Sequence, residues 1–220
     1  MTIARLRRFI ADMTSLTGGA WQDRDEDATV EVGAKLLGEL VGHDDWLPEE
    51  SARCPPHGYA QNLLWCDPFE RFSVVSFVWA PGARTPVHDH QVWGLVGMLR
   101  GSETSQAFVR DGDSGRMTKG SLSLLKPGDV EILRPAAGDI HQVANALPDT
   151  GSISIHVYGG NIGAVRRYTF DPETGKPSLF VSGYTDDQLA AHDVQERNFV
   201  AKPFDRLALT KAVKDALAQP

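Results

Sequence analysis

Short runs of β-branched and aromatic residues, broken at regular intervals by turn residues, fill the chain from about Tyr59 to Phe170. Runs of this composition are typical of strands, and the breaks supply the backbone conformations that tight turns need. Many short strands at regular spacing predict a β-sandwich or a β-barrel. The breaks are Ala80-Pro81-Gly82, Arg100-Gly101-Ser102, Arg110-Asp111-Gly112-Asp113, Lys126-Pro127-Gly128-Asp129 and Leu147-Pro148-Asp149.

Helical patterns of apolar residues flank this region on both sides. Within residues 1–45 two stripes are visible, made by Leu6, Phe9, Ile10 and Met13 and by Val32, Leu36, Leu37, Leu40 and Val41. Such stripes normally pack on a core, so we expect two helices that cover one side of the β region. A turn or hairpin is expected at Asp171–Pro177, and the extension 181–220 is expected to be helical through Leu207, Ala208, Val213, Ala216 and Leu217.

Length and charge bound the kinds of partner that the chain can have. With 220 residues it can build one sizeable core, and we expect a single domain over 1–220 with its β-barrel core at 59–180. The net charge is -7 and the pI is about 5.5, without a block of lysine and arginine that would attract nucleic acid or an anionic membrane. A small molecule is therefore the expected ligand.

Two further patterns bear on location and redox state. Apolar stretches such as Ser73–Gly82 are too short to span a bilayer, and the start of the chain lacks an apolar run followed by a cleavage site. We therefore expect a cytoplasmic protein. Cys54 and Cys66 form neither a Cys-x-x-Cys motif nor a disulfide framework, so both are expected to be reduced.

Histidines at strand spacing provide the main functional signal. His88 and His90 are separated by one residue, and alternate side chains of a strand point to the same face. A third histidine, His141, ends another segment that is rich in glycine and proline. Three neutral imidazoles suit a first-row divalent metal such as iron or zinc. Asp89, between the first two, is expected to face the other way and to accept hydrogen bonds instead of binding metal.

The residues around these histidines resemble the paired motifs of the cupin superfamily, whose members are small jelly-roll β-barrels with a metal inside. The resemblance implies a mainly β fold for this chain, a cupin jelly-roll barrel with helices packed on it. In the usual pattern a glutamate ligand stands where this chain has Gly94, and the spacing from proline to glycine is one residue shorter. The matching positions are Gly82, His88, His90, Gly94 and Gly101 in the first motif and Gly128, Pro135, Gly138, His141 and Asn145 in the second.

A cupin with three histidines and no glutamate resembles the thiol dioxygenases, the cysteine dioxygenase family. The resemblance runs from Tyr59-Ala60-Gln61-Asn62-Leu63 to Arg167, about half of the chain. It implies Fe(II) held by His88, His90 and His141, and the addition of both atoms of O2 to a small thiol to give a sulfinate. Because the missing carboxylate leaves the positive charge of the metal uncompensated, such a site favours anionic ligands.

Period-two alternation in Ile153–Tyr158 places Ser154, His156 and Tyr158 on one face of a strand. Polar groups inside a barrel must pair with one another or with a ligand, because a buried unpaired donor or acceptor costs about 1 to 3 kcal/mol. A chain of hydrogen bonds through the three side chains satisfies them. In the resembled family this relay brings the tyrosine hydroxyl to the open side of the metal, which implies a catalytic role for all three residues.

The expected substrate depends on an arginine that binds its carboxylate. The cysteine-specific branch of the family has an arginine where this chain has Gln61, and glutamine supplies neither the charge nor the fork of a guanidinium. Gln61 matches the bacterial branch that resembles 3-mercaptopropionate dioxygenase, where an arginine further along the chain faces the substrate. Arg167 is the candidate here, with Arg166 as the alternative. Because no cysteine follows Cys66, Tyr158 is expected to carry no thioether.

Other functions remain open on the sequence. The expected partners are O2 and a small thiol carboxylate, with 3-mercaptopropionate first and L-cysteine second. One alternative is a different metal-dependent cupin enzyme, such as a zinc or manganese isomerase or a dioxygenase for a carbon substrate. Another is a cupin that binds a small molecule without catalysis. The different metal cupin would have no use for the arrangement of Ser154, His156 and Tyr158, and in the non-catalytic cupin the histidines would be packed or the pocket empty.

Overall fold

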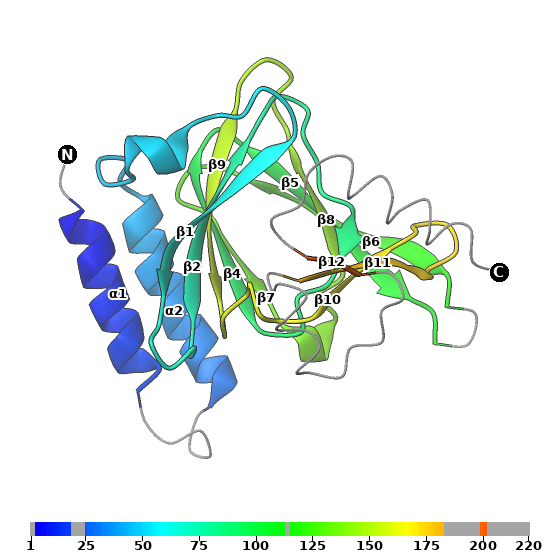
Figure 1. The fold of residues 1–220 in the computed structure, drawn as a ribbon, viewed down its shortest axis with the longest axis horizontal. Coiled ribbons are helices and arrows are strands. Elements are labelled where there is room, and N and C mark those ends of the chain that lie inside the picture. Colours follow the sequence, from blue (N-terminus) through cyan, green and yellow to red (C-terminus); the bar gives the residue numbers. More distant parts are fainter. Residues whose placement is uncertain (1–2, 19–24, 113–114, 183–198, 202–220) are drawn as a thin grey trace.

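The computed structural model describes residues 3–18, 25–112, 115–182 and 199–201, and these residues form the mainly β fold that the sequence predicts (Figure 1). Two sheets face each other, and neighbouring strands are antiparallel except for the last pair, β11 and β12. The five-stranded sheet has the order β1 (Tyr59–Cys66), β2 (Ser73–Trp79), β9 (Ser152–Tyr158), β4 (Gly94–Arg100) and β7 (Val130–Leu133). The seven-stranded sheet has the order β12 (Phe199–Ala201), β11 (Pro177–Ser182), β10 (Arg167–Phe170), β3 (Val87–His88), β8 (His141–Asn145), β5 (Glu103–Arg110) and β6 (Met117–Leu125).

This strand order is that of a jelly roll, because successive strands between β3 and β9 alternate between the two sheets except at the β5–β6 hairpin. The central strand β9 pairs with β2 on one side and with β4 on the other. Its seven residues are all buried. One face of β9 points into the barrel and the other faces the helices, so its side chains belong to two different environments.

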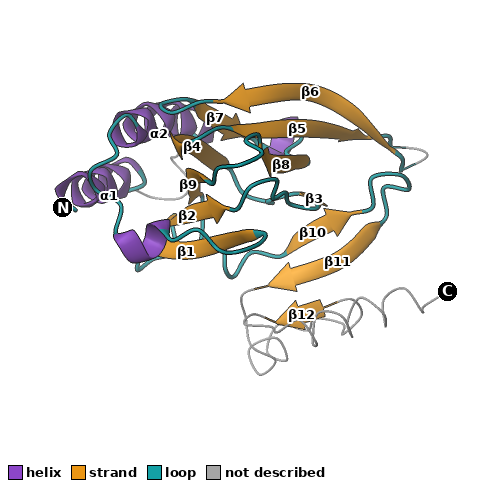
Figure 2. Ribbon diagram, turned by 90° about the horizontal axis from the view of Figure 1, so that it is seen from above, coloured by secondary structure: helices purple, strands orange, loops and turns teal. Residues whose placement is uncertain are grey.

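Two helices, α1 (Ala4–Leu16) and α2 (Glu26–Val41), cover the outer face of the five-stranded sheet, as Figures 1 and 2 show. The carboxylate of Asp25 accepts a hydrogen bond from the amide of Ala28 and caps the start of α2. The core between helices and sheet contains Leu6, Phe9, Met13, Leu37, Leu40, Leu95, Leu99, Ile153, Ile155 and Val157. The expected role of the helices is thereby confirmed, although one residue of the second stripe, Val32, is 43% exposed and lies off the packing face.

Gly97 of β4 allows α2 to approach the sheet closely. A Cβ atom at this position would lie 2.8 Å from the Cγ of Leu37 and 2.9 Å from Val41, both on the buried face of α2. Only a residue without a side chain permits such an approach. The local sequence therefore determines how near the helix layer can lie to β4, the strand that also contains Gly94.

The C-terminal extension differs in part from the expectation. The turn at Asp171–Pro177 is present, since β10 and β11 pair as a hairpin. Within 181–220, however, the structure describes only 181–182 and 199–201, and both segments belong to strands. The helix expected through Leu207 and Leu217 lies outside the described residues. The described residues also contain the shorter helices η2 (Glu49–Ala52) and η3 (Pro135–Ala137).

Two smaller expectations concern the cysteines and membranes. Cys54 and Cys66 are both free thiols. Among the helices that the structure describes, none is both long enough and apolar enough to cross a bilayer.

Candidate metal centre

The three predicted histidines meet inside the barrel, where the last residue of β3 pairs with the first residue of β8 in the middle of the seven-stranded sheet. The backbone of His88 in β3 pairs with that of His141 in β8, and His90 follows directly after β3. Their ring centroids form a nearly equilateral triangle with sides of 4.8, 4.8 and 4.9 Å. One nitrogen from each ring lies within 4.8 Å of the other two, so the group could hold a metal ion.

The nitrogen that faces away from this centre is occupied in each ring. Nδ1 of His88 donates to the carbonyl of Pro86 at 3.0 Å, and Nδ1 of His90 lies 3.3 Å from the carboxylate of Asp139. Nδ1 of His141 bonds to the hydroxyl of Ser105 at 3.0 Å, while its Nε2 is buried without a partner. Partners at Nδ1 orient the rings and leave Nε2 for a metal, the usual arrangement around ligating histidines.

Burial keeps the three imidazoles neutral, which metal binding requires. It lowers the pKa of His88 to about 4 and the pKa values of His90 and His141 well below the ordinary value. The positive charge of Arg167 lowers the pKa of His88 and of His90 further. The chemistry of this donor set, three neutral nitrogens and no carboxylate, fits a divalent first-row metal.

The polar face of β9 lies beside the histidines. Oγ of Ser154 is 2.9 Å from Nε2 of His156, and Nδ1 of His156 is 2.9 Å from the hydroxyl of Tyr158. The ring of Tyr158 stacks on that of His90 with centroids 5.5 Å apart, and Phe77 of β2 stacks on His156 at 4.0 Å. All of these side chains are buried, so the strand presents one continuous chain of hydrogen bonds that ends at the metal centre.

Arg167 and Arg166 occupy different environments. Arg166 is exposed, whereas the guanidinium of Arg167 is largely buried and its Nε has no hydrogen-bond partner. Burial raises the pKa of both Tyr158 and Tyr59 above the ordinary value, and the positive charge of Arg167 opposes part of this rise. Burial in turn lowers the pKa of Arg167. A buried cation with an unpaired donor is suited to bind an anion.

Asp89 holds the strand that carries Arg167. Its carboxylate accepts from the amide of Tyr168 at 2.7 Å and from the side chain of Gln91 at 2.5 Å, and its own amide donates to the carbonyl of Tyr168 at 3.2 Å. This matches the hydrogen-bonding role expected from its place between the two histidines. Because the register pairs Thr169 with His88, Arg167 shares the face of β10 that adjoins the metal centre.

Gln61 lies at the rim of the barrel. Its backbone pairs with that of Phe77, so the side chain shares the face of the sheet that carries Phe77 and Tyr59. Unlike Tyr59, which stacks on Trp79 with centroids 4.9 Å apart, Gln61 is exposed. The structure thus places Gln61 on the same side of the sheet as the site, at an open edge.

Gly94 lies against the ring of Tyr158. A Cβ atom there would be 3.4 Å from Cδ1 of Tyr158 and 3.2 Å from Cδ1 of Leu133. A side chain at this position would therefore require a small shift of Leu133, whereas Tyr158 lies at an ordinary contact distance. Asn145, the last matching position of the second motif, is structural, since it donates to the carbonyls of Ala80 and Thr150.

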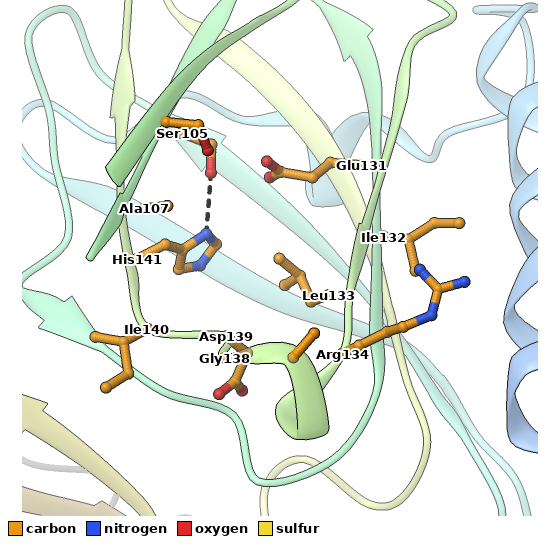
Figure 3. A pocket seen from close by; sticks show the side chains of 12 residues that line it. Ser105, Ala107, Glu131, Ile132, Leu133, Arg134, Gly138, Asp139, Ile140 and His141 are labelled. Atoms are coloured by element: carbon orange, nitrogen blue, oxygen red, sulfur yellow. Dashed lines mark hydrogen bonds between the residues drawn. The ribbon is translucent and has the colours of Figure 1, made fainter. Parts of the chain in front are cut away.

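A cavity of about 210 Å³ opens beside His141, between β7 and the strands β5 and β8 (Figure 3). Its walls include Ser105, Glu131, Leu133, Asp139 and His141. Figure 3 shows the Ser105 hydroxyl pointing to the His141 ring and Arg134 turned away from the cavity, where it pairs with Asp27 and Glu31 of α2. Burial raises the pKa of Glu131, while a hydrogen bond from Ser105 lowers it.

Several residues of the site are absent from the motifs. Ser105, Glu103 and Trp79 come from strands without a metal-binding pattern. The packing of the strands brings Ser105 to His141, Trp79 to Ser154 and Glu103 to Ser152. Asp139 lies two residues before His141 in the sequence. It accepts from both the amide (2.8 Å) and the ring of His90.

No model of a known protein family matches the chain. An uncharacterized conserved protein with a double-stranded β-helix domain from Klebsiella pneumoniae is 21% identical over 51% of this chain and 82% of its own, with a TM-score of 0.41. A cupin superfamily protein from Desulfitobacterium hafniense is 17% identical over 54% of this chain and 94% of its own, with a TM-score of 0.40. Oxalate oxidase in complex with the substrate analogue glycolate is 15% identical over 54% of this chain and 61% of its own, with a TM-score of 0.39. The jelly-roll assignment rests on the strand order and register described above.

Proposed function

We propose that this protein is a non-haem Fe(II) thiol dioxygenase that acts on a small thiol carboxylate, with 3-mercaptopropionate as the preferred substrate. The observation that carries the proposal is the buried chain from Ser154 through His156 to Tyr158, which ends beside three histidines and Arg167. A metal cupin with another chemistry has no need of this chain. A packed, non-catalytic barrel has no need of a buried guanidinium with an unpaired Nε.

The reaction joins both oxygen atoms of O2 to sulfur. Two S–O bonds form, the O–O bond breaks, and the thiolate becomes a sulfinate as sulfur gives four electrons to oxygen. When bound, ferrous iron supplies open coordination positions, makes the thiol acidic and provides a redox centre for O2. The protein's own residues would orient the substrate and exclude water.

Each residue near the centre has a distinct task in this proposal. Arg167 binds the substrate carboxylate, whose charge compensates the buried guanidinium. Tyr158 holds a hydrogen bond to the reacting groups, and His156 and Ser154 fix the orientation of its hydroxyl. Gln61, at the rim, adds no second cation, so a substrate with a single carboxylate is favoured. The order of 3-mercaptopropionate before L-cysteine rests on the match of Gln61 to the bacterial branch of the resembled family. L-Cysteine, which has the same carboxylate and thiol, is the close second substrate.

Oxygen uptake by the Fe(II)-loaded protein tests this proposal directly. We expect consumption of one O2 per thiol in the order 3-mercaptopropionate, L-cysteine, cysteamine, because cysteamine has no carboxylate for Arg167. Mercaptosuccinate tests whether a second carboxylate is tolerated. The same panel with Mn(II) or Zn(II) in place of iron should be inactive. If the protein consumes no oxygen with any of these thiols, the proposed activity is contradicted. A higher kcat/KM for cysteine than for 3-mercaptopropionate would contradict the assigned substrate.

A further inference from the structure

The segment 159–166 joins two groups of the candidate site, Tyr158 at the end of β9 and Arg167 at the start of β10. Three of its residues are glycines, whose backbone is intrinsically flexible. The path of this connection is therefore fixed by contacts with other parts of the chain. Those contacts come from the turn between β1 and β2 and from the first residue of β2.

Ser73, the first residue of β2, holds the middle of the connection. The residue has no exposed surface, and its hydroxyl donates to the carbonyl of Gly160 at 2.7 Å and accepts from the amide of Ile162 at 3.2 Å. The side chain of Ile162 is buried in the same apolar cluster as Tyr158. One hydroxyl thus serves two backbone groups of the connection, on either side of Asn161.

Asn161 is held from the other side by Glu70, in the turn between β1 and β2. Its side-chain amide donates to the carboxylate of Glu70 at 2.9 Å, and its carbonyl accepts from the amides of Ala164 and Val165 at 2.8 and 3.2 Å. The φ angle of Glu70 is 54°, a left-handed conformation that residues other than glycine rarely adopt. Such strain persists only where the surrounding structure imposes it.

The hydrogen bonds of Asp67 impose that conformation. The carboxylate of Asp67 is buried and accepts from the guanidinium of Arg71 at 2.7 and 2.6 Å. It also accepts from the amides of Phe69 and Arg71 at 3.0 and 3.3 Å, and the carbonyl of Asp67 accepts from the amide of Glu70 at 2.8 Å. The turn is therefore a firm support from which Glu70 reaches Asn161.

The two ends of the connection are held differently. Tyr158 is fixed by β9, whose backbone pairs with β2 on one side and with β4 on the other. Asp89 holds β10 only from Tyr168 onward, and Nε of Arg167 is buried without a hydrogen-bond partner. The position of Arg167 thus depends on the backbone that precedes it. A shift of the connection would move the guanidinium and leave Tyr158 in place.

We propose that Ser73 is a positioning residue, whose buried hydroxyl fixes the path from Tyr158 to Arg167 and so places the guanidinium for an anion bound beside the metal centre. Glu70 supports the same path through Asn161. The use of this placement for a substrate carboxylate rests on the proposed function. The placement itself does not, because these contacts belong to the folded protein with any ligand.

Ser73→Ala removes both hydrogen bonds, and Ser76→Ala is its matched control. Ser76 is also fully buried on β2, but its hydroxyl donates to the carbonyl of Ser51 at 2.8 Å, on the opposite face of the strand. In steady-state oxygen uptake by the Fe(II)-loaded full chain, Ser73→Ala should raise KM for 3-mercaptopropionate about tenfold, because the carboxylate ligand is displaced. Both kcat and KM for cysteamine, which has no carboxylate, should stay near the wild type. Ser76→Ala should change none of these constants.

Asn161→Ala covers the case in which Ser73→Ala does not fold. It removes the bond to Glu70 from a side chain outside the core, and Glu70→Gln, whose amide oxygen can still accept from Asn161, is the conservative comparison. KM for 3-mercaptopropionate should rise about threefold in Asn161→Ala and stay near the wild type in Glu70→Gln. An unchanged KM in Asn161→Ala or in folded Ser73→Ala would overturn the proposal. An equal rise in KM for cysteamine would overturn it as well.

The Nε–H signal of Arg167 separates this proposal from the proposed function. We would label the full chain with ¹⁵N-arginine, load it with diamagnetic Zn(II) and assign the signal by its loss in Arg167→Lys. The signal should shift in Ser73→Ala and keep its wild-type position in Ser76→Ala. If the protein oxidises no thiol, this signal still tests Ser73 alone. If it oxidises thiols but neither KM nor the signal responds to Ser73→Ala, only the positioning role is lost.

Discussion

The guanidinium of Arg167 shows how one side chain can select a ligand. Its charge opposes the rise that burial causes in the pKa of Tyr59 and Tyr158, and its Nε is buried without a hydrogen-bond partner. Leaving a buried charged donor unpaired is costly, so an anion that enters the site gains more here than at the surface. Its neighbour Arg166 is exposed and provides a matched comparison one residue away.

Replacement of each arginine by lysine tests this selection. Arg167→Lys keeps the charge but loses the planar fork, so we expect KM for 3-mercaptopropionate to rise about 10- to 100-fold. KM for cysteamine, which has no carboxylate, should change little. Arg166→Lys should leave both constants near the wild type. Steady-state oxygen uptake provides the measurement, and equal effects of the two substitutions would rule out Arg167 as the carboxylate ligand.

At the scale of elements, the helix layer and the barrel meet at Gly97, where the backbone of β4 lies against the side chains of Leu37 and Val41. α2 packs on β4 across Gly97, and β4 continues to Gly94 beside Tyr158. β4 is also hydrogen-bonded to β9, the strand of the polar relay. A displacement of α2 from Gly97 would thus shift β4 and the strand paired with it, β9, which both line the interior of the barrel.

Gly97→Ala should therefore destabilise the protein. Its new methyl group would lie within 3.0 Å of Leu37 and Val41, and forced overpacking typically costs about 1 to 3 kcal/mol. Gly38→Ala, in the middle of α2, is the control. Its Cβ would lie 3.7 Å from Val130, an ordinary contact, and alanine is favoured over glycine in a helix by up to about 1 kcal/mol. Urea unfolding should show loss of stability for the first variant only.

At the scale of the whole molecule, the buried carboxyl of Glu103 links stability to pH. The folded protein holds this proton up to a pKa of about 8, whereas the unfolded chain loses it near the ordinary value of 4.5. Between these two values the folded state binds more protons than the unfolded state. The free energy of unfolding therefore falls as pH rises through this window and levels off above it.

Glu103→Gln removes this dependence. Relative to the variant, the wild type should lose roughly 1 kcal/mol of stability per pH unit between pH 5 and pH 8. Urea unfolding at several pH values, with the metal content held constant, measures the difference. Glu49→Gln, at an exposed position in η2, should show no such trend. If the difference in the free energy of unfolding between the wild type and Glu103→Gln stays constant from pH 5 to pH 8, Glu103 is ionised in the folded protein.

Much of this molecule was predictable because its signals are local. The period-two alternation of β9 predicts one polar and one apolar face, and the structure shows the apolar face against the helices. The spacing of His88 and His90 predicts two imidazoles on one side of the chain, whereas His141 joins them only through the pairing of β3 with β8. The alternation and the spacing depend only on backbone geometry, which each short segment determines for itself.

Where a local pattern was ambiguous, the prediction was wrong. Val32 fits a helical stripe by spacing, yet the face of α2 that includes Val30, Leu37 and Val41 is buried and Val32 is exposed. The apolar stripe of α2 is wider than the face that packs on the sheet. Only the position of β4 decides which residues of the stripe are buried. In the C-terminal extension, 181–182 and 199–201 belong to strands, and the helix expected through Leu207 and Leu217 lies outside the described residues.

The sequence by itself determined the fold class, the three candidate metal ligands and the polar strand, because each follows from periodicity within a few residues. Only the tertiary structure decided which groups surround them. Ser105 reaches His141 across the β5–β8 pair, and Glu103 reaches Ser152 across 49 residues of chain. Such contacts depend on sheet register and on the packing of two sheets, which no short segment specifies alone.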